Sequence, residues 1–181
     1  MNYLDMVRKC TKDYKNKIVN IEKTKEELYH KLKNEIIGQR FYDDKCHELD
    51  ELINATATEG KAEIDKINDS FKEYQRFKYG AKGENVDMAD LELLRGDFDI
   101  TQADADRLKE KYIKAKNYTM LNALKKYAKE HNLNVVYNEQ ETEENYQFDL
   151  FAEFCKAAII DNINFENIDT YYDKVIAHFQ D

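Results

Sequence analysis

The residue types in this chain that could bind a metal ion are concentrated in two short segments. Residues 97–106 carry repeated carboxylates, as a calcium-binding loop does. Such a loop needs glycine at its sixth position and glutamate at its twelfth, and this chain has Gln102 and Leu108 there. We therefore interpret the segment as a polar turn followed by a helix cap.

The second segment contains Asp43, Cys46 and His47, with Asp43 and His47 four residues apart on one face of a predicted helix. Zinc needs three or four convergent ligands, and no second pair in the chain has a suitable spacing. Cys10 and Cys155 have no recognisable histidine–asparagine partners, and phosphate-binding glycine loops are missing. The sequence thus predicts no catalytic residue, no metal and no cofactor, in a protein that is not an enzyme.

The elements that would position any site begin with a helical arm at residues 1–79. Apolar residues recur at steps of three and four from Val7 to Tyr74, as one face of a helix requires. This pattern predicts either a coiled coil or a helical hairpin. Strict heptads counted from Val7 place Lys17, Lys31 and Lys45 at core positions, which favours a hairpin or an irregular bundle over a regular zipper.

Two segments could interrupt the arm, one at Gly38 and one at residues 54–60. We prefer a turn at residues 54–60, because this segment is the least apolar of the arm and Thr58 could cap a new helix. The sequence leaves open whether the arm folds back there or continues as one helix. In both cases its apolar seam needs a partner, and the residues predicted to bind it are Ile18, Ile21, Leu28, Leu32, Leu49 and Ile53.

Composition favours an all-α fold. Proline is absent and only five glycines occur, whereas parallel sheets and loop-rich enzymes use both residues heavily. No apolar run is long enough for a signal peptide or a membrane span. Three cysteines at unrelated spacings indicate a reducing compartment, so we expect a protein that is cytoplasmic in its host cell or associated with a virion.

After a linker at residues 80–86, residues 87–181 are predicted to form a small helical domain. The predicted helix caps are Asp87, Thr101 and Thr142, and Gly96 is expected to end the first of these helices. A further helix is expected to start at Asn117, and Asn164 is expected to precede the last helix. Residues 133–137 have strand-like composition, but a single strand is not stable alone, so we interpret them as an extended connector.

Charge is distributed unevenly along the chain, whose net charge is −9. Residues 132–181 contain 2 basic and 11 acidic residues, whereas residues 105–130 contain 8 basic and 3 acidic residues. The predicted basic surface consists of Arg107, Lys111, Lys114, Lys125 and Lys129. Whether the acidic part pairs with these helices, or both are solvated faces, stays open, and the acidic chain argues against nucleic acid as the main partner.

Part of the amino-acid sequence after the arm resembles a known group of proteins. Residues 91–101, followed by Lys111-Tyr112, residues 117–121 and residues 125–128, resemble small helical proteins encoded among the virion-assembly genes of bacteriophages and prophages of low-GC bacteria. Those proteins often pair an N-terminal coiled coil with a short helical module. The resemblance implies a phage assembly or virion-associated protein without catalysis.

Two functional hypotheses follow. The first is a non-enzymatic structural or assembly protein that associates with itself or with a larger virion component through helix-mediated contacts. The alternative is a small acidic regulator, or nucleic-acid mimic, that occupies a basic surface on a host protein. The two differ in their salt dependence, because binding through exposed charges weakens as salt is added.

Overall fold

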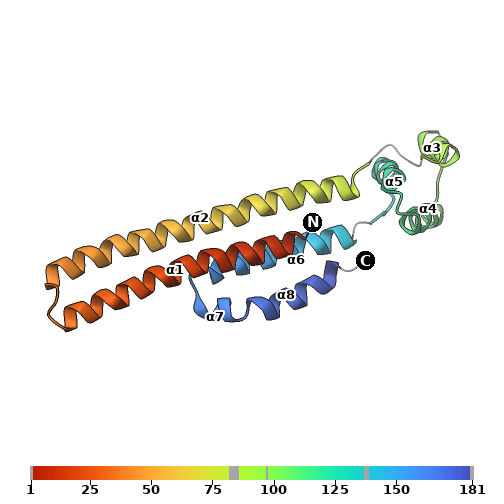
Figure 1. The fold of residues 1–181 in the computed structure, drawn as a ribbon. Helices are drawn as coiled ribbons and strands as arrows, with labels where there is room; N and C mark the ends of the chain where they lie inside the picture. The colour runs from red at the N-terminus through yellow and green to blue at the C-terminus, as the bar shows by residue number, and fades with distance from the viewer. Residues whose placement is uncertain (1, 82–85, 97, 137–138, 180–181) are drawn as a thin grey trace. The chain divides into compact units, whose positions relative to one another are not determined.

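The structure is a computed structural model of the 181-residue chain that describes residues 2–81, 86–96, 98–136 and 139–179. Every regular element within these ranges is a helix, which confirms the all-α fold with long N-terminal helices and a small bundle (Figure 1). The helices are α1 (Tyr3–Lys33), α2 (Gln39–Tyr79), α3 (Met88–Arg95), α4 (Gln102–Lys114), α5 (Tyr118–Glu130), α6 (Glu139–Ala158), α7 (Asn162–Glu166), α8 (Ile168–Ile176) and the 3₁₀ turn η1 (Ala177–Phe179).

Helices α1 and α2 form an antiparallel hairpin whose turn lies at residues 34–38 (Figure 1). Glu35 has a φ of 56°, and its N–H donates to the Leu32 carbonyl, while the Ile36 N–H donates to the Lys31 carbonyl. These bonds satisfy carbonyls at the end of α1 and reverse the chain. The arm therefore folds back at the segment containing Gly38.

The preferred turn at residues 54–60 is wrong, because this segment lies inside α2. Its small residues serve close packing. Thr56, Ala57 and Gly60 are buried, and a Cβ atom added at Gly60 would lie 2.8 Å from Cγ of Tyr14 and 2.9 Å from Cδ1 of Ile159. Residues 54–60 contain few large apolar residues, as a loop does, but they form a helix face that two other segments approach closely.

The chain divides into two compact units, residues 1–71 with 146–181 and residues 72–145. In the first unit, the N-terminal half of α1 and the C-terminal part of α2 pack with α6 and α8 around one core. Phe71 stacks on Phe148 with ring centroids 4.0 Å apart, and Lys12 Nζ lies 2.7 Å from an Asp169 oxygen. The core residues are Leu4, Val7, Ile18, Ala57, Ile64, Ile67, Phe71, Phe148, Phe151, Ala152, Cys155, Ile159, Ile168, Tyr172 and Val175.

This division differs from the predicted domains at residues 1–79 and 87–181. From Tyr146 onward, α6 belongs with the arm, as do α7 and α8, because Phe148, Phe151 and Cys155 fill the seam between α1 and α2. Of the predicted linker, residues 80, 81 and 86 are described and are not helical, and residues 82–85 lie outside the described residues.

The second unit contains α3, α4 and α5 around Leu94, Leu108, Tyr112, Met120, Leu121, Leu124 and Tyr127. Two predicted caps, Asp87 and Thr101, and the predicted helix start at Asn117 are confirmed here. The side chains of Asp87 and Asn117 accept backbone N–H bonds at the starts of α3 and α5, and Thr101 forms a reciprocal capping box with Asp104. Gly96 ends α3 as expected, but its φ of −83° is not left-handed. Glycine is needed there because an added Cβ atom would lie 2.8 Å from the Phe98 ring.

The predicted cap at Thr142 is wrong, and the last helix begins later than expected after Asn164. Thr142 lies inside α6, which begins at Glu139. Asn164 lies inside the short helix α7, which Asp161 caps, and the last helix begins only at Ile168. The described residues 133–136 of the predicted connector have no regular structure, as expected. Within the described residues, no helix has the length and apolar character needed to cross a membrane.

Candidate protein-interaction surface

The part of the hairpin beyond the reach of α6 and α8 is the candidate site. We define the distal hairpin as residues 19–53. None of its residues is buried, whereas the rest of α1 and α2 contributes Val7, Ile18, Ile64 and Phe71 to the core of the first unit. In Figure 1 the distal hairpin consists of two helices only, with α6, α7 and α8 alongside the other half of α1.

Its seam is regular. Apart from Val19, the half-buried residues of α1 after Ile18 are Ile21, Lys25, Leu28 and Leu32, spaced by three and four, and those of α2 include Tyr42, Cys46, Leu49 and Ile53 with the same spacing. A repeat of seven residues is typical of two helices that pack along their length. Heptads counted from Val7 place lysines at core positions because the repeat does not begin there. The buried residues Val7, Thr11, Lys15 and Ile18 cover an eleven-residue step before the seven-residue repeat begins.

Five of the six predicted partner-binding residues lie in this seam. We call Ile21, Leu28, Leu32, Leu49 and Ile53 the distal seam, and all five are half-buried between the two helices. Ile18 differs, because only 1% of it is exposed and the chain's own core covers it. Ile18 is therefore a core residue and is not accessible to a partner.

The structure adds four exposed apolar side chains around the distal seam that the sequence pattern did not select as partner-binding residues. Tyr29, Ile36, Phe41 and Leu52 are between 49% and 69% exposed. Ile36 lies in the turn at residues 34–38, Phe41 follows it in α2, and Tyr29 contacts Tyr42 with ring centroids 6.4 Å apart. Tyr29, Phe41 and Leu52 were visible in the sequence as apolar residues out of step with the seam, and such residues project from its sides. Ile36 fitted the predicted helical series but lies in the turn.

Lys25 occupies a seam position and forms an ion pair with Asp50, with Nζ 2.6 Å from the carboxylate. The two side chains are 29% and 54% exposed, so water screens the pair and limits its contribution to stability. A charged residue at this position weakens the apolar seam and helps to fix its register.

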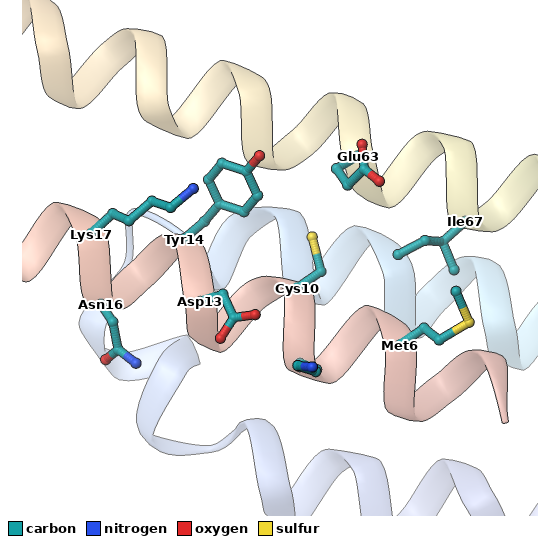
Figure 2. A pocket seen from close by; sticks show the side chains of 9 residues that line it. Met6, Cys10, Asp13, Tyr14, Asn16, Lys17, Glu63 and Ile67 are labelled. Atoms are coloured by element: carbon teal, nitrogen blue, oxygen red, sulfur yellow. The ribbon is translucent and has the colours of Figure 1, made fainter.

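A groove between α1 and α2, with a volume of about 640 Å³, lies closer to the chain termini (Figure 2). Met6 and Ile67 face each other across it, and Cys10 and Tyr14 lie on the α1 side. Lysines and carboxylates surround this apolar part: Lys9, Asp13, Lys17 and Glu63. The groove is open and shallow, as expected where two helices meet without a third one above them.

The Cys10 thiol in this groove is poorly suited to nucleophilic chemistry. Burial raises its pKa to about 11, and the nearby carboxylates of Glu63 and Asp13 add to the shift. Burial likewise raises the pKa of the Cys155 thiol, in the core, to about 12. The thiolate is the reactive form of cysteine, so both residues stay in the less reactive thiol form near neutral pH.

The predicted basic surface lies in the second unit, and part of it is neutralised within the chain. Arg107 Nη2 lies 3.0 Å from Asp104, and Lys111 Nζ lies 2.8 Å from Asp87 and 2.6 Å from Asp90. The Arg107 bond lies within α4, whereas the two Lys111 bonds tie α4 to the start of α3. Lys114, Lys125 and Lys129 are exposed. In the first unit, Asp169 of α8 pairs with Lys12 of α1 and so holds two helices of that unit together.

A buried carboxylate in the second unit is also structural. Glu144 is 1% exposed and accepts hydrogen bonds from Gln75 Nε2 at 2.6 Å, Lys78 Nζ at 2.9 Å and the Tyr79 hydroxyl at 3.1 Å. Burial lowers the pKa of Lys78, but the bonds to Glu144 outweigh it and the pKa is raised. Glu144 thereby joins α6 to the end of α2.

Among the described residues, no three or more His, Cys, Asp or Glu side chains are arranged to hold a metal ion. His47 lies 3.4 Å from Glu51. Asp97, the first residue of the acidic segment at 97–106, lies outside the described residues, and Asp104 caps α4. Compared with known proteins, the chain matches no family model, no curated protein and no solved structure.

Proposed function

We propose that this protein is a non-enzymatic assembly protein that binds other polypeptides through its distal hairpin. One observation carries the proposal: the seam between α1 and α2 is buried where α6 and α8 cover it, and is half-exposed along residues 19–53. Covering apolar surface contributes about 25 cal/mol per Å². The distal seam, with Tyr29 and Leu52 beside it, therefore offers a strip on which a helix-mediated contact can form.

The phage setting of the proposal rests on the resemblance of residues 91–128 to proteins of virion-assembly gene clusters. In that setting the partner is another copy of the chain or a larger virion component, and the protein is virion-associated or cytoplasmic in the host. The genes that flank this one provide a direct test, because virion-assembly genes are expected on both sides.

The acidic regulator is the weaker alternative. It needs carboxylates that are available to a basic partner, but Asp169 is engaged with Lys12 at 2.7 Å and with Arg8 at 3.5 Å, and Glu144 is buried. A regulator of this kind would bind through exposed charge, and its complex would dissociate as salt is added. A seam-mediated complex depends mainly on apolar burial and should persist.

The proposal is tested by replacing a seam residue. Sedimentation equilibrium of the full chain measures self-association, and cross-linking in an extract of the native host measures association with other proteins. We expect Leu28→Asp to abolish the complexes, because it places a charge in the distal seam. Lys23→Asp, at an exposed position of the same helix, should leave them unchanged.

Circular dichroism of both variants separates loss of binding from loss of folding. If the wild-type chain forms no complex with itself or with a host protein, or if Leu28→Asp leaves every complex intact, the proposed function is wrong.

A further inference from the structure

The side of the α1–α2 hairpin that α6 covers continues, without α6, along the distal hairpin. On α2, every seventh residue counted back from Phe71 gives Ile64 and Ala57, and all three are buried in the core that includes α6. The next two positions in this series are Asp50 and Asp43. Because a spacing of seven residues returns to nearly the same side of a packed helix, these carboxylates lie on the side that α6 covers further along.

The same series on α1 leads to the same side. Arg8 stacks over the Tyr172 ring of α8 at 3.8 Å, and the buried Lys15 donates to the Ile160 carbonyl just after α6. Seven residues beyond Lys15 is Glu22, and seven further is Tyr29. Both are exposed. Along this side of α1, the cations Arg8 and Lys15, which contact other helices or their ends, are followed by an exposed carboxylate and an exposed aromatic ring.

Helix α6 ends at Ala158, before these positions are reached. We define the distal slot as Glu22, Tyr29, Asp43 and Asp50 together with the distal seam between them. No other described element lies alongside it in Figure 1. Ile160 and Ile163, at the near end of the slot, are 52% and 72% exposed. An occupant would thus find apolar contacts both in the seam and at this end.

The charge of the slot indicates what kind of helix fits. Residues 39–53 contain two basic and five acidic residues. Asp43 is bonded to the neutral Gln39 amide at 2.7 Å, and Glu22 has no ion pair within the described part of the chain. These two carboxylates carry negative charge that the hairpin itself does not neutralise, so they favour a cationic neighbour.

We propose that the distal slot binds a basic amphipathic helix of a partner protein, placed end to end with α6. Its apolar face would cover Leu28 and Leu49, as α6 covers Ile64, and its lysines or arginines would lie beside Glu22 and Asp43. The inference rests on the proposed function and names the chemistry of the partner. A helix is the expected occupant because the adjoining part of the same slot already holds one.

The test uses two synthetic helical peptides with the same apolar heptad seam. One carries lysine and the other glutamate at the flanking positions. Fluorescence anisotropy with the full chain measures their binding at low and at high salt. The lysine peptide should bind at least tenfold more tightly than the glutamate peptide, and added salt should reduce the difference.

Charge reversal locates the site. Glu22→Lys combined with Asp43→Lys should weaken binding of the lysine peptide about tenfold and strengthen binding of the glutamate peptide, since two attractive pairs become repulsive. Glu27→Lys combined with Glu59→Lys changes the net charge equally at exposed positions outside the slot, and should have little effect. Circular dichroism checks that both double variants remain folded.

Equal binding of the two peptides, absence of binding, or equal effects of the two double variants would overturn the inference. So would a dimer of the chain that excludes the lysine peptide, because a second copy would then occupy the slot. If Leu28→Asp still abolishes complexes of the full chain in any of these cases, the proposed function stands and only the chemistry of the partner is wrong.

Discussion

Lys25 Nζ of α1 lies 2.6 Å from the Asp50 carboxylate of α2, at a level of the distal hairpin that no third helix of the described residues covers. In the seven-residue repeat, Lys25 takes a position equivalent to Ile18 and Leu32. The first of these is buried beneath other helices and the second is half-buried. The ion pair therefore stands at a seam position that apolar residues occupy elsewhere. Replacing Lys25 by an apolar residue should change the stability of the distal hairpin.

We predict that Lys25→Leu stabilises the distal hairpin by about 1 kcal/mol. The substitution loses an exposed ion pair that contributes less than about 1 kcal/mol and extends the apolar seam by one residue. Hydrogen exchange followed by mass spectrometry measures the effect locally. In the wild-type chain, amides of residues 19–33 should exchange faster than those of residues 64–71, and Lys25→Leu should slow the former.

Lys23→Leu is the matched control, because Lys23 is exposed and lies outside the seam. It should change exchange of residues 19–33 by much less. Equal protection of the two segments in the wild-type chain would contradict the view that the distal hairpin lacks cover.

A second prediction concerns the two glycines of the hairpin. Gly60→Ser should destabilise the chain by about 2 kcal/mol, because the added Cβ would lie 2.8 Å from the Tyr14 ring and 2.9 Å from Ile159, and overpacking exceeds the gain in helix propensity. Gly38→Ser should be neutral or slightly stabilising, since no atom lies within 4 Å and serine is a good residue before a helix. Urea unfolding at pH 7 compares the variants, and a similar effect at both positions would contradict the packing described here.

These two glycines also show why the turn was misplaced in the sequence-based prediction. Both positions interrupt an apolar pattern, and residues 54–60 are the more polar of the two segments. What makes Gly60 necessary is the approach of Ile159, a residue almost a hundred positions later in the chain. A contact of that kind leaves no signal in the local sequence, so a packing glycine and a turn glycine look alike.

Local interactions, in contrast, could be predicted well. Asp87 and Thr101 cap helices and Asn117 starts one as expected, because each bonds to a backbone N–H only three residues away. For the candidate site, the spacing of Leu28 and Leu49 was sufficient to place them in a seam. The burial of Ile18 was not predictable in this way, because it depends on helices from the end of the chain folding back onto the arm.

Glu144 provides a third prediction. Glu144→Gln should destabilise the chain by about 3 kcal/mol, because it removes the charge that compensates Lys78 and turns an amide donor toward groups that already donate to this position. Thermal unfolding measures the loss. Glu166→Gln, at an exposed position, should change the free energy of unfolding by less than about 0.5 kcal/mol. A loss at Glu144 no larger than that at Glu166 would show that the buried bonds do not contribute.

The last prediction is a loss of stability at alkaline pH. Burial raises the pKa of Cys155 from 9.0 to about 12 and that of Cys10 from 9.0 to about 11. Above pH 9 the unfolded thiol therefore releases its proton while the folded one retains it. The stability associated with the protonated thiols is complete below pH 9 and is lost as the pH rises toward the folded-state values.

For Cys155, which is fully buried, the free energy of unfolding should fall by up to about 1.4 kcal/mol per pH unit above pH 9. Burial also raises the pKa of the phenols of Tyr79 and Tyr112, so these groups act in the same direction. Urea unfolding between pH 7.5 and about 10.5 measures the slope. Cys155→Ala should lower stability at pH 7.5 but make the alkaline slope shallower, because one of the groups responsible is removed. An unchanged slope would mean that the Cys155 thiol ionises as easily in the folded chain as in the unfolded one.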